Sequence, residues 1–177
     1  MSALLKSFSQ FDAKQNCRVV VLYDSVDTRA KAMQFCDHLL LQFGEELDIE
    51  FDWWRTDFLA EIQLAELSAA NAVTADIFIV CTNPAKQLPP PVKTWFDSWA
   101  DKHAGHLGAL VDLSAMPTGQ PGCAQPFLRE ISKAASLDFL EPIQDASHPY
   151  WASYQASENR VPHRDEPPAP EHYGLNE

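Results

Sequence analysis

The stretch RVVVLYDSVDTRAK, residues 18–31, decides the fold. Its first half is a continuous run of apolar, mostly β-branched residues, which is typical of a strand buried on both faces of a parallel sheet. A helical pattern follows this strand and ends at Gly44, with apolar positions at Ala32, Cys36, Leu39 and Phe43. A buried strand that leads directly into such a helix predicts an α/β protein.

Four further strand patterns follow along the chain. LDIEFDWWR (47–55) alternates apolar and acidic residues, which predicts a half-buried edge strand. ADIFIVCTN (75–83) and HLGALVDL (106–113) are expected to be buried strands, and LDFLEPI (137–143) a weaker fifth strand. Because strands alternate with helices, we predict a three-layer α/β/α sandwich around a five-stranded parallel sheet in the order 2-1-3-4-5.

The helices between these strands carry apolar stripes. The second helix is expected to start at Thr56 as its N-cap, and to bury Leu59, Ile62, Ala65, Ala69 and Ala72. The third opens with prolines and is expected to pack Val92, Trp95, Phe96 and Trp99 into the core. A fourth is predicted within residues 124–136. His38, His103 and His106 are predicted to be solvated.

The chain divides into one domain and two flanking segments. Residues 1–16 are expected to be an arm or short helix, and residues 17–144 the α/β domain. Residues 145–177 form an acidic, proline-rich C-terminal tail that lacks the apolar content to fold and is predicted to be largely disordered. Aromatic residues at its start are expected to anchor it: Tyr150, Trp151 and Tyr154.

Charge and cysteine content limit the classes of partner. A formal net charge of −12, with no basic patch in the sequence, argues against binding to nucleic acid or to an anionic membrane. No apolar run reaches membrane-spanning length. The four cysteines lack metal-ligand spacing and are expected to be free thiols in a reducing, cytoplasmic setting, with no metal site. The partner is expected to be a protein or small molecule, and the oligomeric state stays open.

Ligands of an open parallel sheet bind beyond the carboxyl ends of its strands, beside the point where the strand order reverses. In this sequence the rule selects polar residues after the first, third and fourth strands. They are Asp24, Ser25 and Thr28, then Thr82 and Asn83, then Asp112 and Ser114.

The chain resembles the flavodoxin-like superfamily over roughly residues 17–143. The segment CTNPAKQLPPPVKTWFDSW (81–99) is similar to the one in flavodoxins and quinone reductases where the third strand leads through a proline-bearing loop into a helix. The loop PTGQPGC (117–123) is similar to the next ligand-side loop of that superfamily. The resemblance implies an FMN site, with Ser25, Thr28 and Arg29 at the phosphate and Thr82 and Asn83 facing the flavin ring.

The turn that would hold the phosphate departs from the flavodoxin pattern. That pattern is Thr/Ser-x-Thr/Ser-Gly-x-Thr, whose amides and hydroxyls wrap the phosphate. In YDSVDT (23–28), Ser25 and Thr28 match, but Tyr23 replaces the first hydroxyl residue and Val26 the glycine. Valine resists positive φ, and Asp24 and Asp27 add like charge against a phosphate. The same residues can instead cap the following helix.

The lead hypothesis is therefore a flavodoxin-like domain without an intact cofactor loop, acting as a non-catalytic binding or regulatory module with no cofactor. The alternative is an FMN-dependent oxidoreductase or electron-transfer protein with a divergent phosphate loop. A phospho-accepting receiver domain is disfavoured because CTN stands where the third strand would supply an aspartate. A TIR-like signalling domain is compatible with the fold, but the sequence lacks a clear catalytic glutamate motif.

Overall fold

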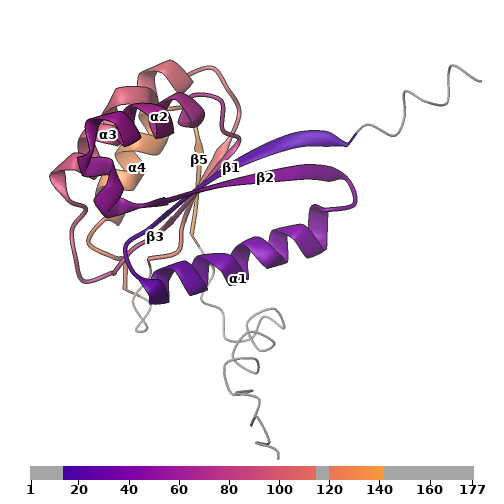
Figure 1. The fold of residues 1–177 in the computed structure, drawn as a ribbon, viewed down its shortest axis with the longest axis horizontal. Helices are drawn as coiled ribbons and strands as arrows, with labels where there is room; N and C mark the ends of the chain where they lie inside the picture. The colour runs from indigo at the N-terminus through magenta and orange to yellow at the C-terminus, as the bar shows by residue number, and fades with distance from the viewer. Residues whose placement is uncertain (1–13, 115–119, 142–177) are drawn as a thin grey trace, which may run out of the picture. The chain divides into compact units, whose positions relative to one another are not determined.

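A computed structural model describes residues 14–114 and 120–141. It contains five parallel strands in the order β2-β1-β3-β4-β5, which confirms the predicted α/β fold and strand order (Figure 1). The strands are β1 (Gln15–Tyr23), β2 (Leu47–Arg55), β3 (Ile77–Cys81), β4 (Ala109–Asp112) and β5 (Asp138–Leu140). The predicted C-terminal tail and most of the predicted N-terminal arm lie outside the described residues.

Helices cover both faces of the sheet, so the described residues form three layers. The helical elements are α1 (Val26–Phe43), the 3₁₀ helix η1 (Thr56–Ala60), α2 (Ile62–Ala72), α3 (Pro90–His103) and α4 (Gln125–Ala134). Helix α1 lies on one face, and α2, α3 and α4 lie on the other (Figure 1). Each face has its own apolar core, because alternate residues of a strand point to opposite faces.

The larger core lies under α2, α3 and α4 and is rich in aromatic rings. Trp99 stacks on Phe78 with ring centroids 4.4 Å apart and planes 2° apart. Trp95 and Phe96 pack edge-on against each other and lie beside Trp99. All four side chains are buried, so the prediction that the tryptophans of the third helix belong to the core is confirmed.

The segment after β2 differs from the prediction. Thr56 does not cap the second helix, because the chain first makes η1, and α2 begins only at Ile62. Thr56 is itself buried, and Glu61 precedes α2 without a side-chain capping bond. Of the predicted stripe, Leu59 and Ala72 are buried and Ala65 and Ala69 pack partly buried against the core, whereas Ile62, the first residue of α2, is 75% exposed.

His103 also differs from the prediction, since it is fully buried at the end of α3. Its Nε2 lies 2.8 Å from the carbonyl oxygen of Ala75, and its Nδ1 lies 3.1 Å from that of Ala135. The first carbonyl precedes β3 and the second follows α4, so the imidazole joins three separate segments. The apolar stripe of α3 did not predict burial of His103, because a polar ring can be buried when backbone carbonyls lie within hydrogen-bond distance of it.

The cysteines are free thiols, as predicted, but they differ in exposure. Cys17, Cys36 and Cys81 are buried, whereas Cys123 is exposed. Burial raises the pKa of both the Cys36 and the Cys81 thiol to about 12, with nearby carboxylates adding to the effect. These two thiols therefore stay protonated at neutral pH and are poor nucleophiles and metal ligands.

The sheet has an overhang at the start of β1 and β2. The two strands pair along their full length, from Gln15 with Leu47 to Tyr23 with Arg55. Strand β3, in contrast, pairs with β1 only from Val19 onward. Residues 15–17 of β1 and 47–49 of β2 therefore form a two-stranded extension that projects past the start of β3, next to the C-terminal half of α1 (Figure 1). We call these six residues the β1–β2 overhang.

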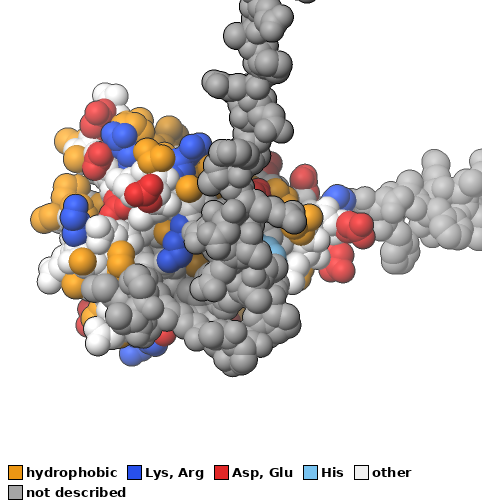
Figure 2. Space-filling model, turned by 90° about the horizontal axis from the view of Figure 1, so that it is seen from below, with side chains coloured by type: hydrophobic (Ala, Val, Ile, Leu, Met, Phe, Trp, Pro, Cys, Tyr) orange, Lys and Arg blue, Asp and Glu red, His pale blue; other side chains and the backbone are white. Residues whose placement is uncertain are grey.

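The surface carries charges of both signs. On the face that Figure 2 shows, basic side chains stand apart among acidic and apolar ones. In the described ranges, no helix is long and apolar enough to cross a membrane. That nucleic acid is not a partner and that the protein is cytoplasmic stay predictions.

Candidate functional site

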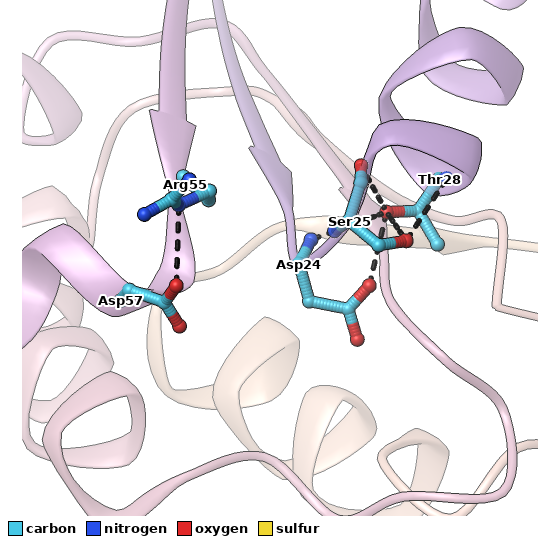
Figure 3. Close-up of polar contacts among 5 residues, drawn as sticks. All are labelled: Asp24, Ser25, Thr28, Arg55 and Asp57. Carbon is cyan, nitrogen blue, oxygen red and sulfur yellow. Dashed lines mark hydrogen bonds and ion pairs between the residues drawn. The ribbon is translucent and has the colours of Figure 1, made fainter.

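A polar cleft lies at the carboxyl edge of the sheet, where the sequence placed the candidate ligand site. Its volume is about 230 Å³. Four of the residues selected at the strand ends line it, Asp24, Ser25, Thr82 and Asn83, and the turn after β1 lies beside the end of β2 there (Figure 3). The described residues that line it are Asp24, Ser25, Thr56, Asp57, Thr82, Asn83, Lys86, Gln87, Leu88 and Pro89.

The turn after β1 is a helix cap. Ser25 is the N-cap residue of α1, and its Oγ accepts a hydrogen bond from the Thr28 backbone N–H at 3.3 Å. The Thr28 Oγ1 in turn accepts from the Ser25 backbone N–H at 2.9 Å. This reciprocal pair is a capping box, which satisfies two backbone donors at the start of the helix. The predicted capping role of the turn is confirmed.

Asp24 connects this cap to the next strand of the sheet. Its Oδ1 accepts a hydrogen bond from the Thr28 hydroxyl at 3.0 Å, and its Oδ2 accepts from the Asn83 backbone N–H at 2.8 Å. The carboxylate therefore links the end of β1, the first turn of α1 and the loop after β3. Both hydroxyls that the resemblance assigned to a phosphate are already hydrogen-bonded within the turn (Figure 3).

A second polar network joins β3 to β4. The Thr82 backbone N–H donates to the Ser114 Oγ at 2.9 Å, and the two hydroxyls lie 3.1 Å apart. The Ser114 backbone N–H donates to the Asp112 Oδ1 at 2.9 Å. All three residues are buried, so these bonds satisfy polar groups that water does not reach. Asn83 also turns inward on its own loop, where its Oδ1 accepts from the Ala85 N–H at 2.9 Å.

Asp112 is the buried carboxyl group of this network. Burial raises its pKa above the usual value of 3.8, and hydrogen bonds from Ser114 and the charges of Lys31 and Arg129 offset only part of the effect. The folded protein therefore holds a proton on Asp112 at a pH where the unfolded chain has lost it. Stability must fall as the pH rises from 3.8 through the raised pKa, since the native state binds more protons there.

We expect Asp112→Asn to remove this pH dependence, because the amide cannot ionise while its oxygen still accepts from Ser114. The variant should gain stability relative to wild type as the pH rises from 4 to 7. Urea midpoints at several pH values measure the effect. Asp101→Asn, a substitution at an exposed position with the same change in net charge, is the control. A constant difference between Asp112→Asn and wild type across this range would contradict the prediction.

The structure brings together only some of the predicted phosphate ligands. Arg29 does not line the cleft. Its guanidinium carbon lies 5.9 Å from the centroids of both the Tyr23 and the Trp53 ring. Thr28 supports the cleft through Asp24 and Ser25 but is not among its lining residues. Val26, which stands in place of the glycine, is the first residue of α1 and is 83% exposed.

Sequence reasoning missed four polar lining residues, Thr56, Asp57, Lys86 and Gln87, and two apolar ones, Leu88 and Pro89. The first two follow β2, and the strand-end rule would have found them if it had been applied to the edge strand as well. The Asp57 Oδ2 lies 3.2 Å from the Arg55 Nε (Figure 3). The Arg55 guanidinium also sits over the Phe58 ring. Lys86 and Gln87 belong to the loop that leads to α3.

The chemistry available at this cleft is limited. Asp24 and Asp57 give it two carboxylates against one lysine, so a phosphate dianion would meet like charge. Across residues 14–114 and 120–141, no three or more His, Cys, Asp or Glu side chains gather as a metal site would require. No cysteine or histidine is found among the described residues that line the cleft.

Comparison with known proteins does not place the chain in a family. No family model matches it, and no curated protein matches its sequence. The strand order and helix placement are consistent with a flavodoxin-like fold. This consistency comes from the structure alone and not from a related sequence.

Proposed function

We propose that this protein is a flavodoxin-like binding or regulatory module that works without FMN. The observation that carries the proposal is the closed turn after β1. Its Ser25 and Thr28 hydroxyls bond to each other and to Asp24, and the Asp24 carboxylate is held by the loop after β3. A phosphate that took both hydroxyls would have to replace the Ser25–Thr28 hydroxyl contact and the bond from the Thr28 hydroxyl to Asp24.

The size and charge of the cleft support the same proposal. A volume of about 230 Å³ lies below the roughly 300–1,000 Å³ of common small-molecule sites. Its carboxylates at Asp24 and Asp57 disfavour a dianion and favour a small neutral or cationic molecule. The competing function, an FMN-dependent electron-transfer protein, needs the turn to open.

Titration of FMN against the protein, followed by quenching of flavin fluorescence, tests the proposal. We expect no saturable binding below about 100 μM, which corresponds to less than about 5.5 kcal/mol of binding free energy. Thr28→Ala should lose about 1 kcal/mol of folding stability, because it removes half of the capping box. It should leave the weak response to FMN unchanged.

Thr94→Ala, at an exposed position on α3, is the matched control for the loss of a threonine hydroxyl. Its stability should stay within about 0.5 kcal/mol of wild type. Micromolar FMN binding by the wild type that disappears in folded Thr28→Ala, but not in Thr94→Ala, would refute the proposal. It would establish the oxidoreductase alternative at the level of cofactor binding.

A further inference from the structure

The outer edge of β2 is the longer of the two edges of the described sheet. Strand β2 pairs with β1 alone, and its nine residues span about 30 Å of backbone. The other edge strand, β5, has only three residues. Alternate residues of an edge strand point their N–H and C=O groups away from the sheet, where a further strand can pair with them. The described sheet therefore has one edge that is long enough for another extended segment.

One side of this edge is apolar and incompletely covered. Every second residue of β2 points toward the face that carries α1, and each of these side chains is only half-buried. The reason is that α1 packs mainly against β1 and β3, and not against the edge strand. The four residues are Leu47, Ile49, Phe51 and Trp53.

The flank of α1 beside β2 extends this apolar surface. The Arg29 guanidinium carbon lies 5.9 Å from the centroid of the Trp53 ring, so Arg29 marks the flank of the helix that faces β2. Met33 and Leu40 follow Arg29 by four and eleven residues, which places them on the same flank. Their exposed fractions are 41% and 43%. We call Met33, Leu40 and the four half-buried residues of β2 the β2 shelf.

The opposite side of the same edge is acidic. Asp48 and Glu50 are exposed and Asp52 is half-buried, each two residues from the next. The Arg18 Nε lies 3.8 Å from the Glu50 Oε2, but both side chains are more than half exposed, so this ion pair is weak. The Asp52 Oδ2 accepts a hydrogen bond from the Asn71 Nδ2 at 2.9 Å, and this neutral donor leaves the carboxylate charged. A strand at this edge would meet negative charge on one side and the β2 shelf on the other.

A second copy of this chain does not suit the edge. If two β2 edges paired in antiparallel fashion, their acidic side chains would lie on neighbouring strands of the same face. Like charges at opposing positions destabilise a sheet, and charged side chains on an edge strand prevent pairing between copies. The same charges favour a strand that carries basic side chains.

We propose that the outer edge of β2 binds an extended segment of another protein in which basic and apolar residues alternate. The backbone of the segment pairs with β2, its apolar side chains lie on the β2 shelf, and its basic side chains lie beside Asp48, Glu50 and Asp52. Because the side chains of a strand alternate between its two faces, an alternating sequence satisfies both sides at once. This inference goes beyond the proposed function, and it uses none of the residues that line the polar cleft.

A nine-residue peptide of alternating valine and lysine, with both ends blocked, is the probe, and isothermal titration calorimetry with the full chain measures its binding. We expect it to bind at least tenfold more tightly than a peptide of alternating valine and glutamate. It should also bind at least tenfold more tightly than a peptide with the same valines and lysines in two separate blocks. Such a block peptide has the same charge but cannot match both sides of the edge.

Two pairs of variants test the acidic side and the shelf separately. Glu50→Lys should weaken the valine–lysine peptide at least fivefold, whereas Asp101→Lys, the same charge change at an exposed position of α3, should alter its affinity less than twofold. Leu40→Glu should weaken the peptide at least fivefold. Leu41→Glu, at the neighbouring position that is 82% exposed and outside the shelf, should alter it less than twofold. Circular dichroism verifies that each variant is folded.

Nuclear magnetic resonance locates the bound peptide. Backbone amide resonances of residues 47–55 should shift on binding, while those of the other edge strand, residues 138–140, should not. Unchanged resonances in 47–55, equal affinity for the alternating and block peptides, or no binding of the valine–lysine peptide would each overturn the inference. So would sedimentation that shows a dimer whose formation shifts the resonances of 47–55 without peptide, because the edge would then belong to a second copy. None of these results depends on FMN, so the proposed function is tested separately.

Discussion

Trp99→Ala is expected to lower the free energy of unfolding by about 3–5 kcal/mol, the largest loss of any single substitution considered for this protein. Trp99 is fully buried and contacts four aromatic rings, of which Phe78 is stacked directly on it. Its indole Nε1 finds no acceptor among the described residues, so the loss comes from packing and not from a hydrogen bond. The vacated space cannot close, because sheet and helix hold its other neighbours in place.

Urea unfolding followed by circular dichroism measures this loss without relying on tryptophan fluorescence. Trp53→Ala makes the same chemical change at a half-buried position on the edge strand, and it should cost distinctly less. A decrease of less than about 1 kcal/mol for Trp99→Ala, with an unchanged m-value, would mean that the aromatic stack does not exist as described. A variant too unstable to purify would agree with the prediction, since domains are stable by only about 5–15 kcal/mol.

His103→Leu is expected to cost about 2–4 kcal/mol, although leucine has a similar size and is more apolar than histidine. The substitution leaves the carbonyl oxygens of Ala75 and Ala135 without the ring nitrogens that lie 2.8 and 3.1 Å from them. A neutral imidazole has one N–H, so one of these two buried acceptors loses its donor, at a desolvation cost of about 1–3 kcal/mol. The edge-on contacts with Phe78 and Trp99 are lost as well.

His106→Leu is the matched control, because His106 lies beside His103 but is exposed. Its stability should stay within about 0.5 kcal/mol of wild type. Equal urea midpoints for the His103→Leu and His106→Leu variants would contradict the bridging role of His103. That outcome would support the prediction from the sequence that His103 is solvated.

Much of the fold could be predicted because its signals are local and repeated. The run from Val19 to Leu22 has the composition of a doubly buried strand, and the alternation in 47–55 marks a strand with one exposed face. The parallel direction of the strands could then be predicted from their alternation with helices. The start of α2 was not predicted, because η1 is stabilised by burial of Thr56 and Leu59 against distant residues.

The candidate site was predicted only in its location. The strand-end rule found Asp24, Ser25, Thr82 and Asn83 because it depends on topology alone. It did not reveal that Asp24 bonds to the loop after β3, which depends on a contact between residues 59 apart in the sequence.

The β1–β2 overhang affects how the free energy of local unfolding is distributed over the sheet. Its six residues have neighbours in two strands and one helix, whereas the centre of β1 is flanked by a strand on each side. Backbone hydrogen bonds in the overhang can therefore break through local opening, without global unfolding. The protection of backbone amides against hydrogen exchange is thus not uniform across the domain. We expect amide protons of residues 15–17 and 47–49 to exchange through local opening, and those of the buried residues Val20 and Val80 to exchange only through global unfolding.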